Sequence, residues 1–472
     1  MKYVSSRGEA PVLGFSDALL AGLARDGGLY LPQEFPKLSP DEIRGLRGKS
    51  YADIAIRVLT PFIGGEIPQA EFERMVREAY ATFRHAAVCP LAQTGANEFV
   101  LELFHGPTLA FKDVAMQLLA RLMDYTLAER GERATIVGAT SGDTGGAAIE
   151  AFAGRDRTDI FILFPHGRVS PVQQRQMTSS TAANVHALSV EGNFDDCQAL
   201  VKGMFNDLKF RDALSLSGVN SINWARIMPQ VVYYFTAAVA LGAPDRSVSF
   251  TVPTGNFGDI FAGYVAKRMG LPINRLVAAT NDNDILHRTL QSGRYETRGV
   301  LQTTSPSMDI QVSSNFERLL FEAHKRDAAT VRGLMDGLKQ SGGFTIGEEP
   351  LSRIRAEFST GRSTVAETAH TIRCVLETTG YLLDPHSAIG VKVGRDQAHE
   401  EPMVVLATAH PAKFPDAVME ASGVTPALPA WLSDLMAREE NYTVLPNDLK
   451  IVEDHISRNS RVLSSGVVRE GV

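Results

Sequence analysis

The sequence predicts an α/β fold with mostly parallel sheets, and two observations carry this prediction. From Glu98 onward, short apolar runs alternate with helical patterns; the runs are residues 99–104, 134–139, 160–164, 185–190, 248–252, 276–279 and 403–407. Continuous apolar strands that alternate with helices are typical of parallel sheets covered on both faces. Glycine-rich segments follow two of these strands, and such sheets bind ligands beyond the carboxyl ends of their strands. We therefore expect the functional residues in these loops.

The composition is that of a globular protein without a nucleic-acid footprint. Its 472 residues are 44% hydrophobic and 21% charged, which suffices for several packed domains and excludes intrinsic disorder as the whole answer. The formal net charge of −7 favours neither nucleic acid nor an anionic membrane as a partner. We expect a cytoplasmic protein, monomer or homodimer, whose partner is a small molecule.

The sequence shows no sign of a metal-binding protein, a disulfide-stabilised scaffold or a membrane protein. The cysteines Cys89, Cys197 and Cys374 form no C-x-x-C pair, and no H-x-x-x-H or H-E-x-x-H spacing occurs. The most apolar long run, residues 231–241, is shorter than the about 20 residues of a bilayer span. The N-terminus has no apolar signal-peptide core. We expect no metal and no membrane segment.

Changes in pattern along the chain predict four segments. Helical patterns indicate an N-terminal module over residues 1–95, with helices at residues 16–24, 39–48 and 69–81. Alternating strands and helices indicate a catalytic core over residues 96–310 and 385–425, with helices at residues 145–152, 194–208, 225–241 and 260–269. Residues 311–384 are mostly helical and charged, which predicts a helical insertion. Residues 426–472 contain several prolines and are expected to be a tail that packs on the core.

Two glycine-rich loops are candidates for anion binding. Residues 140–145 (TSGDTG) lie between a predicted strand and a small-residue helix, and residues 255–259 (GNFGD) lie in the equivalent place. The first N–H groups of a helix lack internal partners and, together with the helix dipole, favour an anion. For either loop alone, a tight turn with a helix cap is an equally good interpretation. Neither loop matches the dinucleotide pattern G-x-G-x-x-G or the G-K-[ST] phosphate loop.

Lys112 is the candidate for covalent chemistry. It lies between Phe111 and Asp113, after the Gly106-Pro107 turn, at the start of an apolar helical run. Most lysines are solvated, but burial beside apolar residues disfavours the ammonium form and lowers the pKa of a lysine. Imine chemistry and proton transfer both require the neutral amine. One such lysine and two anion loops are the minimum apparatus for binding pyridoxal phosphate.

Six motifs resemble those of the threonine synthase family, in its long-chain bacterial and fungal form. They are HGPTLAFKD, GATSGDTGGAA, NSINWARIMPQ, PTGNFGDIFAGY, SMDIQVSSNFERLL and TAHPAKFPDAV, and they follow the family's order over nearly the whole chain. The resemblance implies the tryptophan-synthase-β-like fold of pyridoxal-phosphate enzymes (fold type II), with two α/β subdomains. It also implies a lyase that converts O-phospho-L-homoserine and water into L-threonine and phosphate, the last step of threonine biosynthesis.

The resemblance assigns cofactor-binding roles residue by residue. Lys112 is similar to the lysine that binds pyridoxal 5'-phosphate covalently, and Thr408 of TAHPAKF to the residue that faces the pyridine nitrogen. Asp143 stands where many relatives of this fold place an asparagine near the ring hydroxyl, so an anion there needs a shared proton or a neighbouring cation. The loop that resembles the holder of the cofactor phosphate consists of Gly255, Asn256, Phe257, Gly258 and Asp259.

The resemblance also assigns substrate contacts. The residues similar to those that grip the substrate α-carboxylate are Thr140, Ser141 and Thr144. The residues of NSINWAR similar to those that hold the substrate phosphate are Asn220, Ser221 and Arg226. An arginine suits this task because its planar fork matches two phosphate oxygens at once. A salt bridge on the following helix is the structural alternative for Arg226.

Two other functions remain open from the sequence. A serine/threonine dehydratase-like lyase would share the lysine and both glycine loops, although NSINWAR and the complete TAHPAKF series favour the threonine synthase reading. A non-catalytic binding protein that kept the fold would be expected to lose the lysine, and Lys112 is present in its full motif.

Overall fold

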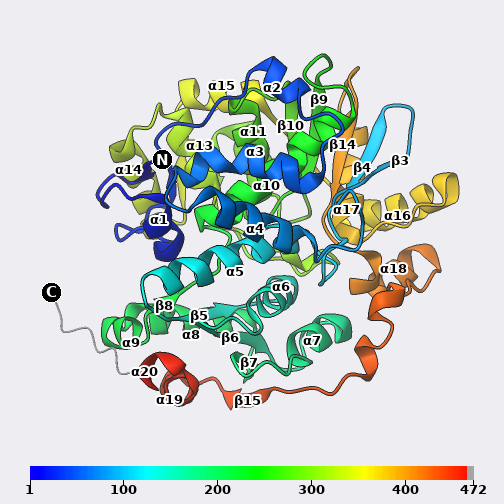
Figure 1. Cartoon of the computed structure of the whole chain (residues 1–472). Coiled ribbons are helices and arrows are strands. Elements are labelled where there is room, and N and C mark those ends of the chain that lie inside the picture. Colours follow the sequence, from blue (N-terminus) through cyan, green and yellow to red (C-terminus); the bar gives the residue numbers. More distant parts are fainter. Residues whose placement is uncertain (465–472) are drawn as a thin grey trace. The chain divides into compact units, whose positions relative to one another are not determined.

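The structure is a computed structural model that describes residues 1–464, and its contacts divide the chain into two compact units. Unit 1 consists of Met1–Ala115 and Ser221–Pro426; unit 2 consists of Met116–Asn220 and the residues from Ala427 onward (Figure 1). The boundaries of these two units differ from those of the four segments predicted from the sequence. The four segments stay predictions.

Unit 1 contains a six-stranded sheet in the order β13-β10-β9-β14-β4-β3 (Figure 1). Neighbouring strands from β13 to β4 are parallel, whereas β3 runs antiparallel to β4. The strands are β3 (Leu91–Gln93), β4 (Glu98–Glu102), β9 (Val248–Pro253), β10 (Ile273–Thr280), β13 (Phe358–Arg362) and β14 (Met403–Ala407). The predicted mostly parallel sheet is confirmed.

Helices bury the central strands of this sheet. Strands β9 and β14 are buried along their whole length. Helix α17 (Pro385–Arg395) contacts β14, β9 and β10, and helix α11 (Gly258–Arg268) contacts β10 and β9. Val100, Val277, Val405 and Ile389 share one apolar cluster. Burial of both faces explains why these strands appear in the sequence as continuous apolar runs.

The parallel register brings several strand ends to one edge of the sheet. Val405 of β14 pairs with both Thr251 of β9 and Val100 of β4. Ala279, near the end of β10, pairs with Pro253 at the end of β9. The connections that follow β4, β9, β10 and β14 therefore all begin at the carboxyl edge, where parallel sheets bind ligands.

The N-terminal part of unit 1 is mostly helical, as predicted. The ribbon of β1 (Tyr3–Ser5) and β2 (Tyr30–Pro32) is antiparallel. The helices are α1 (Phe15–Ala21), α2 (Pro40–Arg44), α3 (Tyr51–Ile63) and α4 (Gln69–Tyr80). Helix α3 was not predicted; it contains Pro61, a residue that normally ends a helix, and is held by a buried face that includes Val58 and Phe62.

The expected helical insertion is helical but also contributes a strand. Its helices are α13 (Phe316–Ala323), α14 (Ala328–Ser341), α15 (Glu348–Glu357) and α16 (Val365–Thr379), and β12 (Gly343–Thr345) pairs with β11 (Arg294–Glu296). The same segment also contains β13, a strand that the mostly helical pattern did not reveal, which pairs with β10 and forms one edge of the main sheet. Its sequence, FSTGR, is short and mostly polar, so it lacks the apolar run of a central strand.

The other helices of unit 1 follow or precede the sheet strands. They are α10 (Trp224–Ala240), α12 (Ile285–Ser292) and α18 (Pro415–Ser422). Helix α5 (Lys112–Glu129) begins in unit 1 and continues into unit 2.

Unit 2 contains a five-stranded parallel sheet in the order β15-β7-β6-β5-β8. The strands are β5 (Ala134–Ala139), β6 (Thr158–Pro165), β7 (Val185–Glu191), β8 (Leu216–Ser217) and β15 (Thr443–Pro446). The helices are α6 (Asp143–Phe152), α7 (Pro171–Thr178), α8 (Phe194–Asn206), α9 (Leu208–Ala213), α19 (Leu449–Asn459) and the short α20 (Arg461–Ser464). The proline-containing tail supplies β15 and α19, whose Leu445 and Val452 join the apolar cluster around Phe161.

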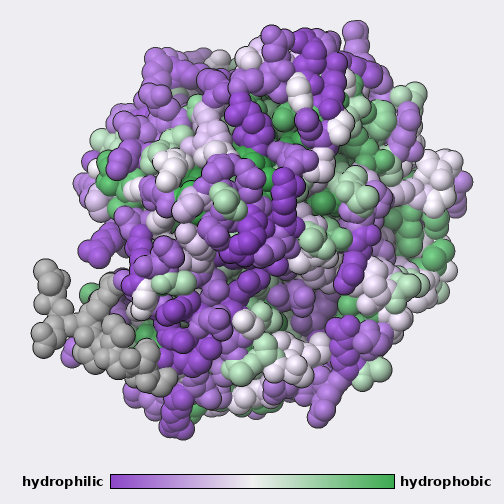
Figure 2. All heavy atoms as spheres, viewed as in Figure 1, coloured by the Kyte–Doolittle hydropathy of each residue, from purple (hydrophilic) through white to green (hydrophobic). Residues whose placement is uncertain are grey.

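The surface drawn in Figure 2 is mostly hydrophilic, with hydrophobic residues in separate patches. Among residues 1–464, no helix combines the length and the apolar character that a bilayer span requires. The same residues contain no cluster of three or more His, Cys, Asp or Glu side chains suited to a metal ion.

Candidate active site

Lys112 lies at the carboxyl edge of the unit 1 sheet, as the first residue of α5. Asp113 fixes the turn before it: its carboxylate accepts hydrogen bonds from the Thr108 amide over 2.8 Å and from the Thr108 hydroxyl over 2.7 Å. The buried ammonium of Lys413 donates to the Thr108 carbonyl over 2.7 Å. The connection between β4 and α5, which places Lys112, is therefore held at Thr108 by hydrogen bonds with Asp113 and with Lys413.

The Lys112 amine is half-buried between a hydroxyl and an aromatic ring. Its Nζ lies 3.5 Å from Ser307 Oγ and 5.3 Å from the centroid of the Phe111 ring. The Phe111 amide donates to the Thr408 carbonyl over 2.9 Å, directly after β14. The structure thus brings Thr408 next to the residue that precedes Lys112. Thr408 itself is almost fully buried.

The loop after β9 has the geometry of an anion site. Phe257 has a left-handed backbone with φ 63°, and its ring packs against Phe316 and Phe358. The turn leads into α11, which begins at Gly258, so the first amides of this helix face outward from its N-terminus. A left-handed conformation at a bulky residue is costly and is concentrated at ligand sites. Residues 255–259 therefore fit a phosphate group bound by main-chain amides.

Asp259 contributes to this loop through its main chain. Its buried carboxyl accepts hydrogen bonds from the hydroxyls of Tyr233 and Tyr234, the latter over 3.0 Å. Burial raises the pKa of Asp259 to about 7. A carboxyl so placed stabilises the helix start but does not attract a phosphate, so the amide of Asp259 is the group suited to the anion.

Ser307 brings the lysine and the phosphate loop together. Its hydroxyl lies 3.5 Å from Lys112 Nζ, and a Cβ atom at Gly255 would lie only 2.8 Å from its carbonyl oxygen. Glycine is required at position 255 because the two main chains approach so closely. The amine of Lys112 and the loop at residues 255–259 thus both lie beside Ser307, and an amine and main-chain amides fit the aldehyde and the phosphate of pyridoxal phosphate.

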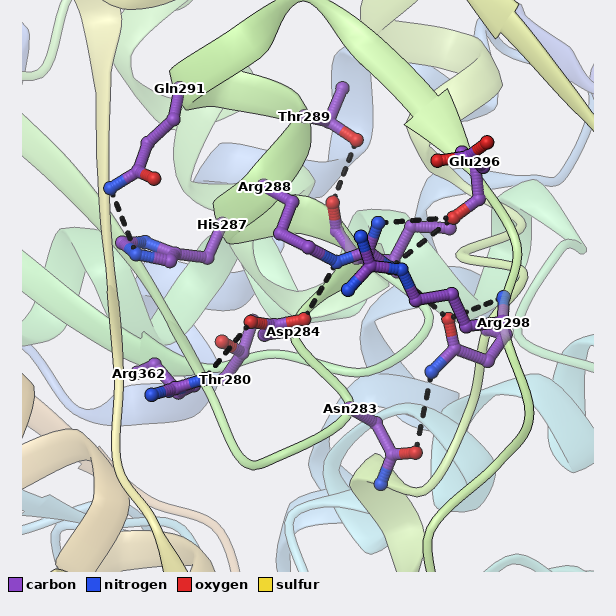
Figure 3. Close-up of polar contacts among 12 residues, drawn as sticks. Thr280, Asn283, Asp284, His287, Arg288, Thr289, Gln291, Glu296, Arg298 and Arg362 are labelled. Atoms are coloured by element: carbon purple, nitrogen blue, oxygen red, sulfur yellow. Dashed lines mark hydrogen bonds and ion pairs between the residues drawn. The ribbon is translucent and has the colours of Figure 1, made fainter.

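A polar network holds the segment that carries Ser307. The amides of Asn281 and Asn283, which follow β10, donate to Asp309 Oδ1 over 2.7 Å and 3.0 Å. Gln311 donates in turn to Asn283 Oδ1 over 3.4 Å. Figure 3 shows Asn283 in the connection that leads into α12. Local sequence patterns do not predict a role for these residues or for Ser307. Ser307, Asp309 and Gln311 lie in the SMDIQVSSNF motif, but their link to Lys112 depends on the tertiary fold.

The NSINWAR segment enters α10 with its arginine buried. Asn223 caps the helix by accepting from the Ala225 amide over 3.0 Å. Arg226 lies in the first turn, is buried, and has its pKa lowered to about 10 by desolvation. Ser221, which is half-buried, offers its carbonyl to the Asn315 amide over 3.2 Å. Asn220 is the last residue of the first segment of unit 2 and is exposed.

The loop at residues 140–145 belongs to unit 2, where it connects β5 to α6. Thr140 Oγ1 accepts hydrogen bonds from the amides of Gly142 and Gly145, each over 2.9 Å, so this hydroxyl shapes the turn. Gln173 donates to Asp143 Oδ1 over 2.9 Å. Ser141 and Thr144 are half-buried at the turn and at the start of α6.

Comparison with known proteins finds relatives along nearly the whole chain. Family models match three parts of the chain: "Threonine synthase N terminus" at residues 2–80, "Pyridoxal-phosphate dependent enzyme" at residues 89–409, and "Threonine synthase, C-terminal" at residues 387–456. Threonine synthase of Pseudomonas aeruginosa is 54% identical over 462 residues, which cover 97% of this chain and 98% of that protein.

Solved structures give the same result. The crystal structure of pyridoxal-phosphate-bound threonine synthase from Brucella melitensis has 81% identity and a TM-score of 0.96, and the match covers 98% of this chain and 100% of that one. The structure of threonine synthase from yeast has 40% identity and a TM-score of 0.92, with coverage of 97% and 98%.

Proposed function

The chain belongs to the threonine synthase family of pyridoxal-phosphate enzymes, and from this membership we infer that it converts O-phospho-L-homoserine and water into L-threonine and phosphate. Its fold is the tryptophan-synthase-β-like α/β fold of this enzyme class. The observation that carries the assignment of the site is that Ser307 contacts both Lys112 and Gly255.

Lys112 is proposed as the covalent anchor and as the base. Bound pyridoxal phosphate supplies an electron sink for the charge left when a proton leaves Cα of the substrate. The Nζ atom of Lys112 would accept this proton. Positioned proton transfer of this kind contributes about 10²–10⁴-fold to the rate.

The overall change at the substrate is a β,γ-replacement. Protons leave Cα and Cβ, and the phosphate leaves Cγ with its bonding electron pair. Protons then return to Cγ and Cα, and water adds its hydroxyl at Cβ while releasing its remaining proton. One water is consumed and one phosphate is released, so atoms and charge balance.

The anion-binding groups divide between cofactor and substrate. We assign the cofactor phosphate to the main-chain amides of residues 255–259, and the cofactor ring nitrogen to the Thr408 hydroxyl, which cannot fix a positive pyridinium as a carboxylate would. Asp143 is proposed near the ring hydroxyl.

We assign the substrate phosphate to Arg226 with Asn220 and Ser221, and the α-carboxylate to Thr140, Ser141 and Thr144. Buried Arg226 in the first turn of α10 supports the phosphate assignment because its planar fork matches two phosphate oxygens at once.

A cytoplasmic location, a monomeric or homodimeric state and the lack of a nucleic-acid partner are proposed as well. The net charge of −7 supports the last of these.

Substitution of the lysine tests the site. The variant Lys112→Ala is expected to lose both turnover and the absorption band of the lysine-bound cofactor. Lys49→Ala, at an exposed loop position after α2, is the matched control and should keep both. Retention of the band in Lys112→Ala would refute the lysine assignment.

A further inference from the structure

We propose that Ser307 is a catalytic residue that orients the Lys112 amine through its hydroxyl, and that His386, fixed by Asp384, is the positioning residue that holds Ser307 in place. The inference rests on the proposed function, since it concerns the same amine. It adds residues that neither the comparisons nor the motif assignments give a role.

His386 is held by a buried carboxylate. Its Nδ1 lies 2.7 Å from Asp384 Oδ2, and its main-chain amide donates to the same oxygen over 2.9 Å. Asp384 caps α17, and its other oxygen accepts from the Ser387 amide over 3.0 Å. Both Asp384 and His386 are nearly inaccessible to solvent. Because a carboxylate only accepts hydrogen bonds, the proton of the neutral ring is on Nδ1.

The histidine reaches Ser307 through its second nitrogen. With the proton on Nδ1, the lone pair of Nε2 accepts a hydrogen bond from the Ser307 amide over 3.3 Å. The Phe414 ring packs 4.8 Å from the His386 ring, centroid to centroid, and restricts its rotation. The tautomer set by Asp384 is thus the one that can receive the Ser307 amide.

Ser307 is fixed on two further sides. It lies in the short turn Pro306–Met308, which is followed by the Asp309 network described above. Its carbonyl is in close approach to Gly255, where a side chain would collide with it. The main chain of Ser307 is therefore held in place, and its hydroxyl lies 3.5 Å from Lys112 Nζ. Such contacts are often long before ligands bind and tighten in the working complex.

A hydroxyl is chemically suited to this amine. During the reaction Lys112 is an ammonium at one stage and a neutral amine at another. A hydroxyl accepts a hydrogen bond from the first and donates one to the second, whereas a carboxylate would stabilise only the ammonium. Ser307 can therefore keep Nζ in one place while its proton comes and goes, which is the positional effect that makes an attack efficient.

The test measures how fast Lys112 captures the cofactor, separately from turnover. Full-length protein stripped of cofactor is mixed with pyridoxal phosphate, and the growth of the absorption band of the lysine-bound cofactor is timed. Loss of one hydrogen bond of this kind, about 1 kcal/mol, corresponds to about a fivefold slower capture in Ser307→Ala. Ser307→Thr keeps a hydroxyl and should restore most of the rate.

Two histidine variants form a matched pair. The side-chain oxygen of His386→Gln can stand at the place of Nε2 and accept from the Ser307 amide, so capture should stay near the wild-type rate. His386→Asn is too short to reach this amide and should be slowed as Ser307→Ala is. His399→Asn, in the connection before β14, is the control for histidine loss and should behave as wild type.

The outcomes separate the two hypotheses. If wild-type protein forms no band, the proposed function fails. If wild type forms the band and Ser307→Ala captures the cofactor at the same rate, or if Gln and Asn at position 386 are equally slow, the inference about Ser307 and His386 is overturned. The expected order, with Asn slow and Gln fast, supports it even if Ser307→Ala does not fold.

Discussion

The side-chain amide and the main-chain amide of Asn315 both donate hydrogen bonds to the carbonyl oxygen of Asn256, each over 3.0 Å. Asn315 is fully buried, and its side-chain amide also lies 3.2 Å from the Ser221 carbonyl. The buried guanidinium of Arg318 donates to the Asn315 side-chain oxygen. One amide therefore holds the loop assigned to the cofactor phosphate and the segment assigned to the substrate phosphate.

We expect Asn315→Ala to weaken pyridoxal phosphate binding. The variant removes the side-chain amide that donates to the carbonyls of residues 221 and 256, at a cost of about 2 kcal/mol, or about 30-fold in the dissociation constant. Titration of cofactor-stripped protein measures this constant. Ser314→Ala is the matched control, because the half-buried hydroxyl of Ser314 makes a long hydrogen bond, 3.4 Å, to the side-chain oxygen of Asn256. Equal binding by the two variants would contradict the role given to Asn315.

We expect Gly255→Ala to disturb the site by steric pressure. The added Cβ would lie 2.8 Å from the Ser307 carbonyl, which belongs to the main chain and cannot move away cheaply. Overpacking of this kind costs about 1–3 kcal/mol, and here we expect it as slower cofactor capture as well as lower stability.

Gly333→Ala is the control for this substitution. Position 333 lies in α14, and no heavy atom lies within 4 Å of a Cβ built there. This change should stabilise the helix by about 0.5–1 kcal/mol. A Gly255→Ala variant that unfolds and captures the cofactor as wild type does would show that the close approach to Ser307 is not needed.

The sequence predicts those parts of the fold whose burial has a local signature. Strands β9 and β14 are buried on both faces and appear as apolar runs, so their positions follow from the sequence. Strand β13 lies at an edge and is polar, and α3 contains Pro61, so tertiary packing decides both. Lys112 is recognised from its motif. Ser307 is not, because its role depends on a main-chain approach to Gly255 between segments distant in sequence.

Asp259 should make stability depend on pH. Burial raises its pKa from 3.8 to about 7, so the folded protein holds this proton more tightly than the unfolded chain does. Below the unfolded pKa both states are protonated and the group has no effect. As the pH rises toward 7, the unfolded chain ionises first and stability falls.

The variant Asp259→Asn cannot ionise at position 259, so it does not lose stability in this way as the pH rises. Its side chain keeps an oxygen for the Tyr233 and Tyr234 hydroxyls. Relative to wild type it should gain of the order of 2 kcal/mol between about pH 5 and about pH 8, measured by urea unfolding. A difference between the two proteins that is constant with pH would mean that Asp259 is ionised in the folded state at both values.

Arg226 should act on the substrate phosphate rather than on the cofactor. Because its guanidinium is buried and its pKa is lowered to about 10, a dianion in contact with it gains a strong, weakly screened interaction. We expect Arg226→Ala to raise the KM for O-phospho-L-homoserine by about 100-fold while the dissociation constant of pyridoxal phosphate changes less than about threefold.

Arg226→Lys keeps the charge but loses the paired geometry, so its KM should lie between those of wild type and Arg226→Ala. Inorganic phosphate provides a second measurement, because its competition with substrate should weaken in the same order. The melting temperature of each variant with bound cofactor shows whether folding is preserved. Equal losses of cofactor and substrate affinity would count against the assignment, since a residue that holds only the substrate phosphate leaves the 255–259 loop unchanged.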